Sequence, residues 1–234
     1  MAGIAGNPSI VTSGLALYLD AANKKSYRGT GTSWLDLSGN NNTATASPTV
    51  PVFSNEGGGS FSFNGSSNYF SINDSPSVSP SAGITILSWT KSTSYGDMNI
   101  VGKDSSYQNQ TFNSNGIENS IFSAGQGWLQ PRTNGSILSV SKWNHIAISY
   151  STTDYYQRTY LNGLELTSNN MPYLRTGAFQ TIINDSSASV YIGSWTGTAE
   201  FFNGYIASIL IYNRALSASE VLQNFNAIKP RFNI

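Results

Sequence analysis

Apolar and polar residues alternate with a period of two in many short segments of this chain, and this is the pattern of half-buried β-strands. The segments with this pattern are 15–19, 34–37, 61–63, 69–72, 84–91, 98–102, 119–124, 136–140, 143–150, 156–166, 190–193 and 205–212. Polar, turn-rich stretches separate them, and the longest, at 21–33, 104–118 and 167–188, predict loops. Within 156–166, Asn162-Gly163 predicts a hairpin turn, whereas 61–72 is typical of a hairpin or a tight corner.

Only the end of the chain has the pattern of a helix. Ser217 and Glu220 form a capping box, and Leu216 and Val221 are spaced as a hydrophobic staple. The apolar residues that follow recur at helical spacing, and Pro230 ends the run. About a dozen short strands and one helix predict an all-β fold, a two-sheet antiparallel jelly-roll sandwich with one short C-terminal helix. We expect an N-terminal arm at 1–13 and a single domain at 14–234.

The composition narrows the function. The chain has 12 basic and 12 acidic residues, a net charge of zero and only 10% charged residues. Nucleic acid and anionic membrane surfaces are bound through basic residues, so neither is expected as a partner. There are no cysteines, which excludes disulfides and thiolate metal sites. The first residues do not have the pattern of a signal peptide, so we expect synthesis in a cytoplasm.

Several segments together resemble the laminin-G-like, concanavalin A-like lectin and glucanase domains. The segments that carry the resemblance are GLALYLDA (14–21), WLDLSGN (34–40), FSFNG (61–65), WNHIA (143–147), YLNG (160–163) and GYIA…IYNRALS (204–217). The closing segment is similar to copies found in virion proteins of tailed bacteriophages. The resemblance implies the jelly-roll fold and a place on a virion surface, as a capsid decoration or as a tail-fibre module.

Hydrolases on this fold carry acids two residues apart, as in E-x-D-x-E, so that both lie on one face of a strand. The five glutamates are Glu56, Glu118, Glu165, Glu200 and Glu220, and none has an acid two residues away. The seven aspartates, Asp20, Asp36, Asp74, Asp97, Asp104, Asp154 and Asp185, are scattered. We therefore expect no catalytic residue and no enzyme activity. Acids that meet only in space remain the alternative.

Two further kinds of site need specific residues. His145 is the only histidine, and its place in a strand favours a structural role over a catalytic one. The resemblance implies calcium as the usual ion, and Asp36, Asn40, Asn184 and Asp185 could contribute oxygen ligands. Such sites need several carboxylates and these loops have few, so we assign no metal ligand and expect no cofactor, with calcium as the alternative.

Carbohydrate binding needs exposed aromatic rings beside amides and hydroxyls. The candidate rings are Tyr95, Tyr107, Trp128, Tyr155, Tyr173 and Trp195. Each of them could instead seal a loop onto the sandwich. We expect a non-enzymatic virion-surface structural protein that adheres to host surface polysaccharide. In that setting it contacts other virion proteins through the arm and could form a homo-oligomer. The alternative is a soluble lectin module outside any virion.

Overall fold

Two antiparallel sheets form the protein, which we describe from a computed structural model that covers residues 8–123, 127–133, 135–167 and 187–234. The first sheet contains β1 (Leu15–Asp20), β4 (Val52–Ser54), β5 (Ser60–Asn64), β7 (Gly83–Ser92), β12 (Asn144–Ser151), β13 (Tyr156–Leu161), β14 (Leu164–Glu165) and β16 (Asn203–Tyr212). The second contains β2 (Ser33–Trp34), β3 (Ala44–Ser47), β6 (Tyr69–Ile72), β8 (Met98–Lys103), β9 (Tyr107–Phe112), β10 (Gly116–Ser123), β11 (Gly127–Leu129) and β15 (Val190–Ile192). The predicted two-sheet sandwich is confirmed.

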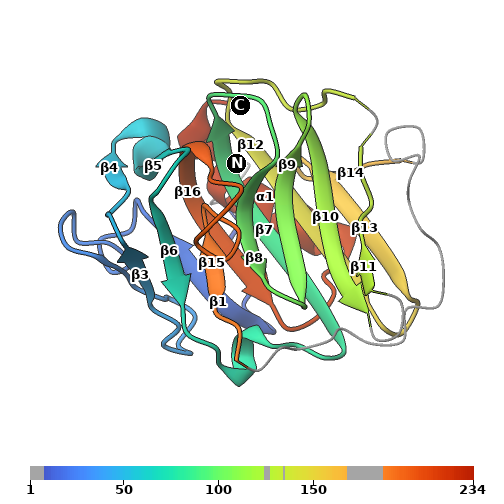
Figure 1. Cartoon of the computed structure of the whole chain (residues 1–234). Coiled ribbons are helices and arrows are strands. Elements are labelled where there is room, and N and C mark those ends of the chain that lie inside the picture. Colours follow the sequence, from blue (N-terminus) through green and yellow to red (C-terminus); the bar gives the residue numbers. More distant parts are fainter. Residues whose placement is uncertain (1–7, 124–126, 134, 168–186) are drawn as a thin grey trace, which may run out of the picture.

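The strands are ordered β14-β13-β12-β7-β16-β5-β4 in the first sheet, with β1 also paired to β16. In the second sheet the order is β11-β10-β9-β8-β15-β6-β3-β2. The second sheet lies in front of the first in Figure 1. Neighbours in the sheets are often far apart in sequence, as expected for a jelly roll.

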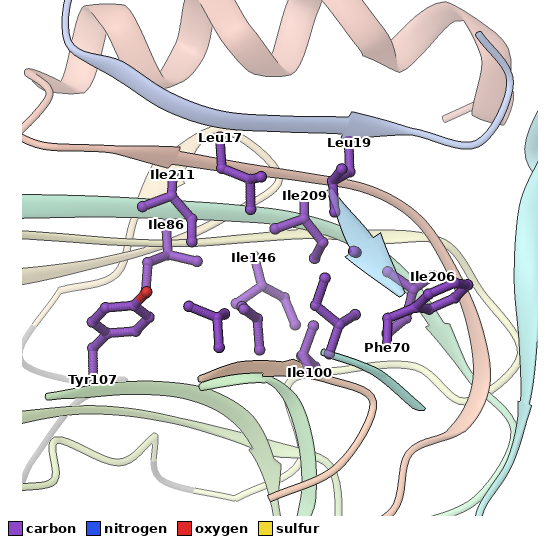
Figure 2. Close-up of a cluster of buried hydrophobic side chains, with 14 of the residues drawn as sticks. Leu17, Leu19, Phe70, Ile86, Ile100, Tyr107, Ile146, Ile206, Ile209 and Ile211 are labelled. Atoms are coloured by element: carbon purple, nitrogen blue, oxygen red, sulfur yellow. The ribbon is translucent and has the colours of Figure 1, made fainter. Parts of the chain in front are cut away.

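The core fills the space between the sheets, as Figure 2 shows. Alternate residues of each strand point into it, among them Leu17 and Leu19 of β1 and Ile209 and Ile211 of β16. From the second sheet, Phe70, Ile100 and Tyr107 meet them. Burying these side chains removes apolar surface from water, which is the main force that holds the two layers together.

The helix α1 (Ala218–Ile228) covers the outer face of the first sheet, and the short 3₁₀ segment η3 (Lys229–Phe232) follows it. The predicted capping box between Ser217 and Glu220 is present. Phe225 and Phe232 stack on Trp89 of β7, with ring centroids 5.5 and 4.1 Å away. The outer face of the first sheet is therefore a second apolar core and leaves little room for a ligand.

The last residues of the predicted arm lie against this same layer. The backbone N–H of Val11 donates to Asn224 Oδ1 at 2.8 Å, and Tyr212 Oη donates to the Val11 carbonyl at 2.7 Å. Gln223 also donates to the Ser9 carbonyl. Residues 8–13 are thus held by the domain itself, whereas residues 1–7 lie outside the described part of the chain.

Two element predictions were wrong. The expected loop at 104–118 contains β9 and the start of β10, which pair as a hairpin, because the polar side chains of these strands do not show the apolar alternation. No strand forms at 136–140. Of the two alternatives for 61–72, the corner is confirmed, because β5 and β6 belong to different sheets. Two 3₁₀ turns, η1 (Glu56–Gly58) and η2 (Pro76–Val78), lie in connections. Of the loop predicted at 167–188, only residues 167, 187 and 188 are described.

Candidate functional site

The outer face of β8, β9 and β10 is polar, in contrast to the apolar outer face of the first sheet. Side chains alternate along these strands, so Tyr107 points into the core while Gln108 and Gln110 point outward. The register places Gln110 opposite Glu118, and Gln108 opposite Ser120. Four polar side chains from two strands therefore lie together on the outside of the second sheet, and we call this group the polar floor.

Hydrogen bonds run across the polar floor from one glutamate to another. Gln108 Nε2 donates to Glu200 Oε2 at 2.8 Å and to Gln110 Oε1 at 2.6 Å. Gln110 Nε2 then donates to Glu118 Oε1 at 2.9 Å. The two glutamates are 82 residues apart in sequence, so their link through two amides is visible only in the fold.

Glu118 is the buried end of this network, with no exposed surface. It forms an ion pair with Arg132, whose side chain is partly exposed. Its Oε1 also accepts hydrogen bonds from Ser120 at 3.1 Å and Gln130 at 3.0 Å. A buried carboxylate with this many donors is fixed in position, so Glu118 orients its neighbours and does not contact a ligand itself.

Glu200 is the open end of the network and is only partly buried. Burial raises the pKa of its carboxyl, as do the charges of Asp97 and Glu118, while the hydrogen bond from Gln108 lowers it. Its other oxygen, Oε1, has no hydrogen-bond donor among the residues that the structure describes. Glu200 can therefore accept hydrogen bonds from a ligand.

Two tryptophans border the polar floor. Trp128 lies opposite Phe122 in the β10–β11 pairing, which puts it on the same face of the sheet as Glu118 and Ser120. Trp195 packs edge-to-face against Trp128, with the ring centroids 5.7 Å apart. Both tryptophans are partly exposed. Large rings beside amides and carboxylates are the usual combination of a carbohydrate site.

Gly102 makes room for Trp195 on the sheet. A Cβ at Gly102 would lie 2.8 Å from the Trp195 ring and 2.9 Å from Asn99 Oδ1. Asn99 is fully buried and its Nδ2 donates to the Ser194 carbonyl, but its Oδ1 has no partner in the described structure. An unused buried acceptor therefore lies beside the tryptophan at the border of the polar floor.

The predicted aromatic candidates fare differently. Trp128 and Trp195 are brought together, but Tyr107 is fully buried and donates to the Val78 carbonyl at 3.1 Å, so its assignment as a ligand platform was wrong. Tyr95 and Tyr155 are exposed in the β7–β8 and β12–β13 connections, without a described ring contact to the tryptophan pair. Tyr173 lies outside the described residues.

The residues considered as possible calcium ligands form hydrogen bonds within the protein where they are described. Asp36 accepts hydrogen bonds from the backbone of Tyr18 and Asn42 and from Ser38. Asn40 uses its amide group to donate to the Ala16 carbonyl. Asn184 and Asp185 lie outside the described residues. Within the described ranges, no three His, Cys, Asp or Glu residues cluster as a metal site would require.

His145 lies far from the polar floor, beneath α1. Its ring is buried between Trp89 and Phe225, at centroid distances of 5.2 and 5.5 Å. Burial lowers the pKa of the imidazole to about 3. The ring is therefore neutral at ordinary pH and acts as a packing group.

Sequence reasoning missed the polar floor itself. Gln108-x-Gln110 and Glu118-x-Ser120 do alternate with a period of two, which is the signal of a strand. The polar character of Gln108, Gln110 and Glu118, however, predicted a loop at 104–118, and only Ser120 fell within a predicted strand. Glu200 has no such local signal, because its connection to Gln108 depends on the fold.

Comparison with known proteins agrees with this architecture. A family profile described as the concanavalin A-like lectin/glucanases superfamily matches residues 64–222. No curated protein sequence matches the chain. Among the described residues, no helix is long and apolar enough to cross a membrane.

Several solved structures share the fold at low identity. Domain 4 of AbnA, an extracellular arabinanase from Geobacillus stearothermophilus solved in complex with arabinotriose, is 17% identical, with a TM-score of 0.65 over 90% of this chain and 97% of that domain. The binding domain of botulinum neurotoxin serotype G is 20% identical, with a TM-score of 0.65. The binding domain of Paraclostridial Mosquitocidal Protein 1 is 18% identical, with a TM-score of 0.68. Both toxin matches include about 90% of this chain, but the chain spans only about half of either toxin domain.

Proposed function

The chain belongs to the concanavalin A-like lectin/glucanases superfamily, and on that basis we propose that it is a non-enzymatic carbohydrate-binding module. The observation that carries the proposal is the tryptophan pair Trp128 and Trp195 beside the polar floor. A sugar ring has an apolar C–H face, which stacks on an indole, and hydroxyl groups, which hydrogen-bond to amides and carboxylates.

Each accessible group then has a role in binding. Trp128 and Trp195 provide stacking surface, while Gln130, Arg132 and Glu200 provide polar contacts at the border of the polar floor. Glu118, Gln108 and Gln110 lie beneath and hold these groups in place. Because these fixed partners are already in position, little entropy is lost when a ligand binds.

Structures of the same fold support a binding role. The arabinanase domain 4 was solved with arabinotriose, and a binding domain of botulinum neurotoxin DC, 14% identical with a TM-score of 0.66, was solved with SialylT. Another structure of that toxin domain holds rat synaptotagmin II, so this fold also presents protein-binding surfaces. Arabino-oligosaccharides are therefore a reasonable first probe for this chain.

The acids of the polar floor argue for binding without hydrolysis. A glycosidase needs one carboxylate on the reacting carbon and a second on the leaving oxygen. Glu118 is fully enclosed and already accepts from Arg132, Gln110 and other donors, so it cannot reach a sugar. Within the hydrogen-bonded network of the described residues, Glu200 is then the one accessible acid. We expect no release of reducing ends from any glycan that the protein binds.

Alanine substitution of the tryptophans tests the proposal. Trp195→Ala and Trp128→Ala should each weaken glycan binding about 10- to 100-fold, the usual loss for a central aromatic contact. Binding would be measured by titration calorimetry with arabinotriose and with hits from a glycan array. The matched control is Tyr95→Ala, which removes an exposed ring without a described contact to the tryptophan pair and should leave affinity unchanged.

Two results would contradict the proposal. One is the absence of binding to any glycan on a broad array. The other is binding that survives both tryptophan substitutions while thermal unfolding shows the variants to be folded. In the second case the ligand would bind elsewhere on the molecule.

The setting of the module is the second part of the proposal: it is displayed on a virion, as a capsid decoration or tail-fibre module, and holds particles on host polysaccharide. The likeness of residues 204–217 to segments of phage virion proteins supports this setting. Many displayed copies would turn weak single sites into firm attachment. Imaging of purified particles with this chain labelled should show density at regular positions, and its absence from particles would leave the soluble lectin as the function.

A further inference from the structure

We propose that the polar floor and its border select uncharged glycans over carboxylated ones, and that Glu200 is the residue that imposes this selection. The inference rests on the proposed carbohydrate-binding function and specifies the ligand class of that same site. It follows from how the charges of the site are paired and from which hydrogen-bonding atoms remain unused.

The only cation that the described residues place at this border is already neutralised. Arg132 forms an ion pair with Glu118, and Glu118 has no other positive partner among the described residues. The Arg132 guanidinium also lies over the Phe112 ring, 4.2 Å from the centroid. The nearby Lys103 is fully buried and pairs with Asp74, at the end of the core. The charge of each cation is therefore matched by a carboxylate, which leaves no unmatched positive charge here for an acidic sugar.

The charge that remains is negative. Glu200 accepts a hydrogen bond from the neutral Gln108 and pairs with no cation among the described residues. Burial raises the pKa of its carboxyl, and the negative charges of Asp97 and Glu118 raise it further. Asp97 accepts the Asn113 backbone N–H at 2.7 Å, which leaves its charge uncompensated as well. A carboxylated sugar entering this field would meet like charge, which is a strong means of rejecting a ligand.

The unused acceptor at the surface also favours hydroxyl groups. Glu200 is partly exposed, and its Oε1 has no donor in the described structure. A sugar hydroxyl can donate to this oxygen. A sugar carboxylate offers only acceptors, so it would leave the Glu200 oxygen unsatisfied.

Matched glycan pairs that differ only in charge test the inference. Suitable pairs are lactose with sialyllactose, and methyl-esterified oligogalacturonide with its free acid. For any pair in which binding depends on Trp195, the wild-type protein should prefer the uncharged member by about tenfold or more. Glu200→Gln should reduce this preference several-fold, and Glu200→Lys should reverse it. The control Glu56→Gln removes an exposed glutamate elsewhere and should leave the preference unchanged.

The outcomes separate the two proposals. If the carboxylated member binds as tightly as the uncharged one, or if Glu200→Lys does not shift the preference in a folded protein, the charge selection is wrong while the lectin function stands. If no glycan binds, or if binding is indifferent to Trp195, the proposed site fails and the inference fails with it. Thermal unfolding of each variant shows whether the variant is folded, so a change in glycan preference can be distinguished from unfolding.

Discussion

His145 is a single residue whose burial should make the stability of the whole protein depend on pH. The folded state keeps the ring neutral, with a pKa of about 3, whereas the unfolded chain takes up a proton near the ordinary value of 6.5. Stability is therefore fully present above pH 6.5 and is lost as the pH falls toward 3. The expected loss between pH 7 and pH 5 is about 2 kcal/mol. Urea unfolding at a series of pH values measures it.

His145→Phe is the matched variant, because it keeps an aromatic ring between Trp89 and Phe225 but cannot titrate. Its stability should vary less with pH over the same range. Equal pH dependence in both proteins would show that other groups cause the acid destabilisation.

At the scale of single residues, the sequence predicted some site members and not others. Trp128 and Trp195 were among the candidate rings because they lie in or near predicted loops. Tyr107 has the same local pattern but lies in the core, since strand register decides which way it points. Glu200 could not have been identified, because its role depends on Gln108, 92 residues earlier in the chain.

Among the elements, α1 was the easiest to predict, and its cap offers a direct test. Ser217 accepts the Glu220 backbone N–H, and two hydrogen bonds from Arg214 contribute most to lowering the pKa of Glu220 to about 2. Ser217→Ala should destabilise the protein by about 1 kcal/mol, the usual cost of losing an N-cap. Urea unfolding measures the change.

Ser219→Ala is the control, because Ser219 is exposed in the same turn and its hydroxyl contacts Ser217 Oγ at 3.0 Å but does not accept the Glu220 backbone N–H. It should change stability by less than about 0.5 kcal/mol. Neither variant should alter glycan binding, since α1 covers the first sheet and the polar floor belongs to the second. A loss of binding in folded Ser217→Ala would mean that the two layers are coupled.

The hairpin of β9 and β10 shows why other elements were harder to predict. Strands were expected where apolar and polar residues alternate, but Gln108, Asn109 and Gln110 are polar on both faces. Asn109 satisfies its inward side chain with Asn119 and Ser88 inside the sandwich. Polar residues can occupy such a strand only because partners from other strands complete their hydrogen bonds, and these partners are not visible locally.

The molecule as a whole has two unlike sides. One side carries α1, where residues 8–10, 227–228 and 230–231 line a common hollow. The other side carries the tryptophan pair and the polar floor. Figure 2 shows the order of the layers from the helix, through the first sheet and the core, to the second sheet. Attachment near either described end of the chain would therefore leave the proposed site facing away from the support.

Immobilisation through single cysteines tests this arrangement, and the natural absence of cysteine makes the chemistry specific. The protein would be coupled through Leu222→Cys, on the partly exposed surface of α1, or through Gln130→Cys, beside the polar floor. Surface plasmon resonance should show full glycan-binding capacity for the first and about a tenfold loss or more for the second, because the support then blocks the ligand. Free Gln130→Cys, measured in solution, separates blockage from the loss of the glutamine itself. Equal capacity in both orientations would place the glycan site on another surface.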